Sequence, residues 1–254
     1  MSRRIDLNCD LGESFGAYTM GNDEAMLRLI TSANVACGMH GGDPEVMATT
    51  FATARENGVA VGAHPGFPDL WGFGRRPMPF TPAEIERLVA YQIGAAMGVA
   101  ALAGARITHV KAHGALGNMA SADASIARAV ARAVKAVDSS LWLIAIAGTQ
   151  SQIEGEKAGL SVASEIYADR TYNPDGTLTS RQLPNAMVHD PKEAAERIVD
   201  MVTSGSIIAT DGSRLPVRMD TICIHGDGRA AVATAEAVRG ALIAAGIELR
   251  PFIH

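Results

Sequence analysis

Three strand-like segments carry polar side chains at every second position. The polar members are Asp6, Asn8 and Asp10 in 5–10, His109, Lys111 and His113 in 107–113, and His225 and Asp227 in 221–227. Because successive side chains of a strand point to opposite faces, each set lies on one face. Carboxylates, imidazoles and an ammonium in one pocket supply general acids and bases, with a cation for a developing oxyanion.

Other strand-like segments end in similar groups. Glu165, Tyr167 and Asp169 lie in register, and two further segments end in His40-Gly-Gly-Asp43 and His64-Pro65. In parallel αβ proteins, chemistry gathers where strands end and loops begin. We therefore predict an active site here. The expected catalytic residues are Asp10, Lys111, His113, Asp169 and His225, and the expected substrate-binding residues are Asn8, Asp43, Arg76, Glu165, Arg170 and Asp227.

A metal site is an alternative use of some of these residues. Asp10, His40 and His64 form a mixed carboxylate–imidazole set, which suits zinc or a similar divalent ion. The three residues belong to different segments, so their spacing along the chain does not test the idea. A role for these residues in acid–base catalysis and a role in metal binding both stay open at this point.

Two long loops are rich in arginine and aromatic residues. Residues 65–80 contain Arg75 and Arg76, and residues 169–184 contain Arg170 and Arg181. Arginine forks suit carboxylate or phosphate groups. We expect these loops to form active-site lids.

The elements that must position these residues alternate along the chain. Strand-like runs cover 5–10, 33–37, 59–64, 107–113, 141–146, 161–168 and 221–226, and helical patterns include 82–103, 123–137, 191–203 and 229–245. Three helices are expected to begin at a capping residue followed by proline, at 43–44, 81–82 and 190–191. Repeated βα units predict a parallel sheet. We expect one α/β domain over 1–254, a (β/α) barrel of about seven strands, with a doubly wound open sheet as the alternative.

Composition narrows the function classes. The 254 residues carry a net charge of −5 with no basic block, which argues against nucleic acid or an anionic membrane as partner. Three widely spaced cysteines indicate neither a disulfide framework nor a zinc knuckle. The uncharged stretch 88–105 is rich in alanine and glycine and predicts a helix packed on a sheet. A strand-like pattern begins at once after Met1, without a signal peptide, so we expect a cytoplasmic enzyme.

Seven ordered motifs resemble the LamB/YcsF family over essentially the whole chain. They are DLNCDLGES at 6–14, ANVACGMHGGDP at 33–44, GAHP at 62–65, PDLWGFGRRPM at 68–78, VKAHGALGN at 110–118, ADRTYNPDGTL at 168–178 and IHGD at 224–227. The resemblance implies a distorted barrel related to the glycoside hydrolase/deacetylase superfamily. It also implies ATP-dependent opening of the 5-oxoproline lactam to glutamate, together with two further subunits, B and C.

For that reaction, residue chemistry suggests roles that the resemblance does not assign. Asp10 or His113 would activate water, Lys111 would stabilise an oxyanion or phosphate, and Arg170 or Arg76 would hold the substrate carboxylate. ATP, as Mg-ATP, is the expected cofactor, and no GxxxxGK[ST] P-loop occurs. Two rivals remain: a metal-dependent deacetylase or amidohydrolase that works without ATP, and a non-catalytic subunit of the complex.

Overall fold

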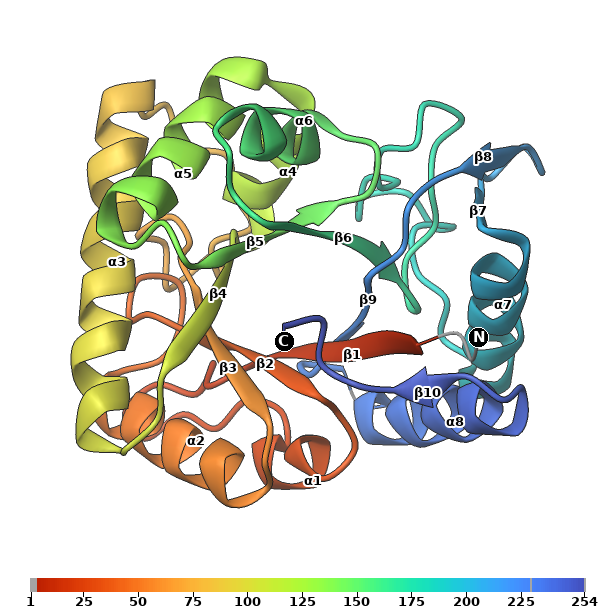
Figure 1. Cartoon of the computed structure of the whole chain (residues 1–254), viewed down its shortest axis with the longest axis horizontal. Helices are drawn as coiled ribbons and strands as arrows, with labels where there is room; N and C mark the ends of the chain where they lie inside the picture. The colour runs from red at the N-terminus through yellow and green to blue at the C-terminus, as the bar shows by residue number, and fades with distance from the viewer. Residues whose placement is uncertain (1–3, 229, 254) are drawn as a thin grey trace.

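Seven parallel strands close into a barrel (Figure 1). The computed structural model describes residues 4–228 and 230–253. The barrel strands are β1 Arg4–Leu11, β2 Ser32–Ala36, β3 Ala60–His64, β4 Ile107–Lys111, β5 Trp142–Ile146, β6 Val162–Tyr167 and β9 Thr221–His225. Pairing of β1 with β9 completes the ring. The seven predicted strands and the barrel are thus confirmed, and the open sheet is excluded.

Helices surround the ring, with α3 and α5 on the left of Figure 1 and α7 and α8 on the right. Their bounds are α1 Asp23–Leu27, α2 Pro44–Glu56, α3 Pro82–Leu102, α4 Gly114–Ala122, α5 Ala124–Val137, α6 Gln150–Lys157, α7 Pro191–Ser204 and α8 Ala231–Ala244. A hairpin of β7 Ser206–Ile208 and β8 Arg214–Pro216 follows α7, and the short β10 Glu248–Leu249 pairs with β1. Arg229, the predicted start of the last helix, lies outside the described residues.

Three helix starts have the predicted capping chemistry. The side chains of Asp43, Thr81 and Asp190 each accept a hydrogen bond from a first-turn amide, and each precedes a proline at the first helical position. Such caps satisfy amides that have no partner within the helix. The three caps therefore fix where α2, α3 and α7 begin on the outside of the barrel.

Helix α3 contains most of the uncharged stretch seen in the sequence. It is long and apolar enough, by length and composition, to cross a membrane. In this structure it packs along α5 and against β3 and β4, with Ile85, Val89 and Ile93 fully buried. The prediction of a helix pressed against the sheet is confirmed, since the apolar face of α3 covers the barrel.

The interior of the barrel is polar, whereas its outer face is apolar. Along β1, Leu7 and Cys9 belong to the hydrophobic core around the strands, and the alternate residues Asp6, Asn8 and Asp10 bond to other polar side chains. Barrels of this kind normally fill their interior with branched apolar side chains. Here a hydrogen-bond network takes that place, since a buried polar group without a hydrogen bond costs free energy.

One part of this hydrogen-bond network is centred on Asp6 and His109. The hydroxyls of Thr31 and Ser32 donate to Asp6 Oδ1 at 2.6 Å each, and that of Thr221 donates to Oδ2. His109 Nε2 lies 3.0 Å from Asn34 Oδ1. A glycine at position 62 of β3 makes room for this imidazole, because a Cβ there would lie 2.2 Å from His109 Cδ2. These contacts close the end of the barrel opposite the predicted site.

The buried Asp6 predicts a pH-dependent stability. Burial raises the pKa of Asp6 to about 6, although the hydroxyls of Ser32, Thr221 and Thr31 oppose the rise. The folded chain therefore binds a proton at Asp6 more readily than the unfolded chain does, and protonation below pH 6 stabilises the fold. Relative to Asp6→Asn, the wild type should gain about 1 kcal/mol in unfolding free energy between pH 7 and pH 5.

Urea unfolding of both proteins at several pH values measures this difference. A difference that stays constant across that range would contradict the raised pKa. An opposite slope, with the wild type losing stability relative to Asp6→Asn as the pH falls, would contradict it as well.

Candidate active site

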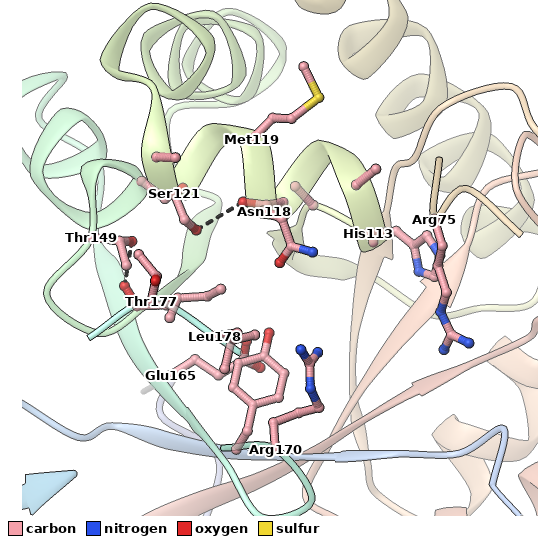
Figure 2. A pocket seen from close by; sticks show the side chains of 18 of the residues that line it. Arg75, His113, Asn118, Met119, Ser121, Thr149, Glu165, Arg170, Thr177 and Leu178 are labelled. Carbon is pink, nitrogen blue, oxygen red and sulfur yellow. Dashed lines mark hydrogen bonds between the residues drawn. The ribbon is translucent and has the colours of Figure 1, made fainter. Parts of the chain in front are cut away.

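A pocket of about 690 Å³ opens at the carboxyl ends of the barrel strands. Figure 2 shows α4 along one side of it, with the amide of Asn118 pointing across the space toward Glu165 and Arg170. The charged and imidazole side chains that line it are Asp10, His64, Arg75, Lys111, His113, Glu165, Arg170, Asp175, Arg181 and His225. The expectation that functional groups gather at the carboxyl ends of the strands therefore located the pocket correctly, because closure of the barrel brings these strand ends together around one opening.

The floor of the pocket holds a buried ammonium, that of Lys111. Its Nζ lies 2.8 Å from Glu165 Oε1, 2.9 Å from Asp10 Oδ1 and 3.0 Å from Cys223 Sγ. Burial disfavours the charged amine, but the neighbouring charges, with Asp10 first, outweigh it and hold the pKa of Lys111 well above its usual value. The ammonium stays protonated at neutral pH and is available to a negative charge in the pocket.

Asp10 is ionised in this environment. Burial opposes ionisation, yet the charges of His64 and Lys111 hold the pKa of Asp10 well below its usual range. The amide of Asn34 also donates to Asp10 Oδ1 at 2.9 Å. Asp10 is thus a fixed negative charge between Lys111 and the imidazole of His64, whose Nε2 lies 3.3 Å from Oδ2.

Three imidazoles and a carboxylate gather beside this floor, and we name His40, His64, His113 and Glu13 the imidazole cluster. One ligand atom from each lies within 4.8 Å of all the others. Nδ1 of His64 lies 2.7 Å from the main-chain oxygen of Lys111, and Nε2 of His113 lies 2.8 Å from that of Phe73. A carbonyl oxygen only accepts, so both of these nitrogens carry hydrogen.

The remaining ring nitrogens of the imidazole cluster face inward. His113 Nδ1 lies 3.0 Å from His64 Nε2. Burial and the neighbouring imidazoles hold the pKa of His113 well below its usual value, so Nδ1 of this neutral ring presents a lone pair. Carbonyl groups that orient imidazoles in this way are typical outer partners of metal-ligating histidines.

Buried polar atoms without a partner test whether a cation fits the imidazole cluster. Within the described residues, neither ring nitrogen of His40 and not Oε1 of Glu13 has a hydrogen-bond partner. Burial lowers the pKa of His40 and raises that of Glu13. Gly74, at φ 61°, lets the loop close over the rings, since a Cβ there would lie 2.7 Å from His40 Cβ. A divalent ion would satisfy Oε1 of Glu13 and one ring nitrogen of His40, and three imidazoles with one carboxylate suit zinc.

A second group of ligand-type atoms, on Asp10, Cys223 and His225, fits a cation poorly. Lys111 Nζ already lies 2.9 Å from Asp10 Oδ1 and 3.0 Å from Cys223 Sγ. A second positive charge there would be repelled by the ammonium. Of the metal residues expected from the sequence, His40 and His64 therefore meet in the imidazole cluster, while Asp10 pairs with Lys111 and contacts that cluster through His64.

A histidine–aspartate dyad lies on the other side of the pocket. His225 Nδ1 lies 2.7 Å from Asp169 Oδ2, so it donates its hydrogen to the carboxylate. Burial opposes the ionisation of Asp169, but the neighbouring imidazole of His225 lowers the pKa of this carboxyl. Arg181 Nη2 donates to His225 Nε2 at 3.1 Å, which therefore holds the lone pair. The imidazole is oriented in the way a general base or acid requires.

The predicted substrate-binding residues lie in different places. Glu165 and Arg170 line the pocket. Asn8 lies beneath it, donating to Glu165 Oε1 at 3.0 Å and to Thr221 Oγ1 at 2.7 Å.

Asp43, Arg76 and Asp227 are not among the residues that line the pocket. Asp43 caps α2, and Arg76 pairs with Asp69 on the surface of its loop. Asp227 reaches the rim only through Arg75, at 2.7 Å. The structure thus places these three side chains outside the pocket lining, and a role for them in substrate binding stays a prediction.

Sequence reasoning missed Glu13, Arg75 and Arg181 as site residues. Glu13 follows Asp10 by three positions in the loop after β1, and it completes the imidazole cluster. Arg75 and Arg181 lie in the two loops whose arginine content was noticed, but at positions next to or beyond those chosen. Loop conformation decides which side chain turns inward, and side-chain periodicity says nothing about it.

Comparisons with known proteins agree with this architecture. The chain is 59% identical over 249 residues to a Gluconobacter oxydans protein named as the A subunit of 5-oxoprolinase, with 98% of each chain covered. It is 47% identical to a solved lactam utilization protein from Thermus thermophilus, with a TM-score of 0.91 and 97% and 99% of the two chains covered.

A more distant structure shares the fold alone. The solved "T48 deacetylase with substrate" is 14% identical, with a TM-score of 0.52 over 99% of this chain and 89% of the other. The LamB/YcsF family itself matches residues 5–254. Because this match covers nearly the whole chain, the chain belongs to the LamB/YcsF family.

Proposed function

We propose that this chain is the lactam-opening component of a cytoplasmic, ATP-dependent 5-oxoprolinase, which hydrolyses 5-oxoproline to L-glutamate together with subunits B and C. Relatives named as the A subunit of 5-oxoprolinase, at 59% and 55% identity over 98% of the chain, support this assignment. The structural observation that carries it is the paired ammonium of Lys111 at the floor of the pocket.

Lys111 would stabilise the negative charge that develops on the lactam oxygen or on a phosphate attached to it. Its pKa lies well above the usual value, so it remains a cation throughout the reaction. A charge fixed in advance by Asp10 and Glu165 needs no rearrangement when the transition state forms, which is where such groups are most effective.

The dyad of His225 and Asp169 would move the proton. Nε2 of His225 faces the pocket with its lone pair, and the 2.7 Å contact with Asp169 holds the ring in that tautomer. Water entering the ring-opening step needs a base, and the departing amine nitrogen needs an acid. One imidazole serves both steps in turn. By contrast, His113 directs its lone pair into the imidazole cluster and not into the pocket.

ATP would activate the amide oxygen of the lactam by phosphorylating it, since an unstrained amide is a poor electrophile. The sequence has no P-loop, so we assign part of the nucleotide binding to subunits B and C. The role of this chain is to hold the lactam against Lys111 and to supply the proton transfers. The pocket of about 690 Å³ is large enough for more than a five-membered ring.

Reconstitution tests the assignment directly. The chain mixed with subunits B and C, 5-oxoproline and Mg-ATP should form glutamate, ADP and inorganic phosphate, the phosphate leaving from the activated oxygen. Omission of any protein or of ATP should abolish glutamate formation. Glutamate release is measured by chromatography. Turnover without ATP would instead support an ATP-independent amidohydrolase, and unchanged turnover without this chain would assign it a non-catalytic role.

Replacement of Lys111 tests the chemistry of the pocket floor. In the reconstituted mixture, Lys111→Ala should lower kcat by about 100-fold or more, because it removes the cation that faces the developing charge. Lys157→Ala is the matched control, since Lys157 pairs with Glu154 on the surface.

Lys111→Ala leaves two buried carboxylates unpaired and can destabilise the fold. The double variant Lys111→Met/Glu165→Gln removes one of the two charges, and circular dichroism checks that each variant is folded. Full turnover by a folded variant that lacks the ammonium would remove Lys111 from the mechanism.

The imidazole cluster favours a second candidate function, that of a metal-dependent amidohydrolase or deacetylase acting without ATP. Its fit to a divalent ion rests on the partnerless atoms of His40 and Glu13. Such an ion, when bound, supplies Lewis-acid polarisation of an amide carbonyl. Phe73 and the main chain of Lys111 would orient the ligating rings through their carbonyl oxygens.

Metal binding can be measured without any assay of activity. In calorimetry the wild type should bind one Zn²⁺ per chain. His40→Gln and Glu13→Gln should each weaken binding by about tenfold or more, since each removes one of four ligands. His189→Gln, on the exposed surface, should bind as the wild type does. Absence of binding by the wild type, or equal binding by His40→Gln, would contradict the site.

A further inference from the structure

Arg181 lies at the mouth of the pocket, on the loop that follows β6. Its Nη2 donates to Nε2 of His225 at 3.1 Å, and its Nη1 lies 3.6 Å from the sulfur of Met187. In the part of the chain that the structure describes, Arg181 has no ion pair with a carboxylate, whereas Arg75 pairs with Asp227. Arg181 is therefore a guanidinium at the pocket that makes no direct ion pair among the described residues.

The surroundings of Arg181 contain charges of both signs, with Arg75 and Arg170 against Asp169 and Asp227. Burial and the charges of Arg75 and Arg170 lower the pKa of Arg181. Three guanidinium groups against these two carboxylates leave a local excess of one positive charge, which attracts an anion. The fork geometry of arginine suits a carboxylate in particular, through two parallel hydrogen bonds.

Arg170 supports the segment that carries Arg181. Its Nη2 donates to the main-chain oxygen of Thr179 at 2.6 Å, and its Nε donates to that of Ala186 at 3.3 Å. These two carbonyl groups flank Arg181 along the chain. Arg170 is thus a positioning residue that holds the loop, and it leaves the recognition of a ligand to Arg181.

The contact between Arg181 and His225 has a consequence for the dyad. Nδ1 of His225 donates to Asp169, so only the lone pair on Nε2 can accept a proton. As long as Arg181 donates to that lone pair, it is not available to water. A carboxylate binds a guanidinium more strongly than a neutral imidazole nitrogen does, because its hydrogen bonds are charge-assisted.

We propose that Arg181 binds the carboxylate of the substrate and that this binding draws its guanidinium away from Nε2 of His225, which frees the base. The proposal rests on the proposed function and names its specificity-determining residue. It restricts efficient turnover to lactams that carry a carboxylate beside the ring nitrogen. A lactam without the carboxylate would leave His225 occupied.

The test compares two lactams in the reconstituted mixture: 5-oxoproline and 2-pyrrolidinone, which is the same ring without the carboxylate. For Arg181→Gln, kcat/KM with 5-oxoproline should fall by about 100-fold, chiefly through KM. With 2-pyrrolidinone it should stay the same or rise. Where turnover of 2-pyrrolidinone is below detection, its Ki as an inhibitor of 5-oxoproline turnover is compared between the wild type and Arg181→Gln, and this Ki should not rise in the variant.

Two further variants separate recognition from folding. Arg181→Lys keeps the charge without the fork and should recover part of the loss with 5-oxoproline. Arg214→Gln is the matched control, because Arg214 pairs with Asp200 on the exposed β7–β8 hairpin. It should leave both lactams unaffected.

The outcomes distinguish this proposal from the one on which it rests. Wild-type turnover of 5-oxoproline tests the proposed function, and the ratio between the two lactams tests the role of Arg181. An equal loss of kcat/KM with both lactams would assign the guanidinium to the chemical step. A rise confined to KM for ATP would assign it to binding of a phosphate. Either result would overturn carboxylate recognition by Arg181. An unchanged ratio in Arg181→Gln would overturn it as well.

Discussion

The pairing of one buried ammonium organises the interior of this barrel. Lys111 points inward from β4, and an unpaired charge at that depth would cost several kcal/mol. Asp10 on β1 and Glu165 on β6 supply the negative charges at 2.9 and 2.8 Å. These carboxylates need further donors, which Asn34 and Asn8 provide. The polar interior is therefore a connected network, to which the barrel strands other than the apolar β5 contribute polar side chains.

Three chemical regions follow from this network around a single pocket. The floor holds Lys111, the imidazole cluster lies beside it through the contact of Asp10 with His64, and the dyad of His225 and Asp169 lies toward the rim. The register of β1 with β9 sets Asp10 next to His225, so floor and dyad occupy neighbouring strands. Loops add the parts that respond to ligands, above all Arg181. The barrel thus positions these groups beneath side chains that its loops carry to the mouth of the pocket.

Periodicity in the sequence predicted the strands and the shared polar face of β1 and β4, because a period of two directly reports which side chains share a face. The barrel was predicted from the repeated βα units and from the family resemblance. Periodicity could not predict loop conformation. Arg76 was chosen where Arg75 turns inward. Arg170 does line the pocket as expected, but two of its donors hold main-chain carbonyl groups, which the sequence did not reveal. Asp43 follows a strand like the others, but its carboxylate caps α2. Glu13 was missed, since it lies beyond the alternating part of β1.

The protonation state of Lys111 is the most direct test of this account. The chain has four lysines, at 111, 135, 157 and 192, so ¹⁵N-lysine labelling and one substitution assign the Nζ signal of Lys111. An ordinary lysine titrates near pH 10.4. The account predicts that the Lys111 signal remains that of an ammonium, unchanged, up to pH 10.5, because its pKa is held well above the usual value. A signal that shows a neutral amine at or below pH 8 would contradict the central claim.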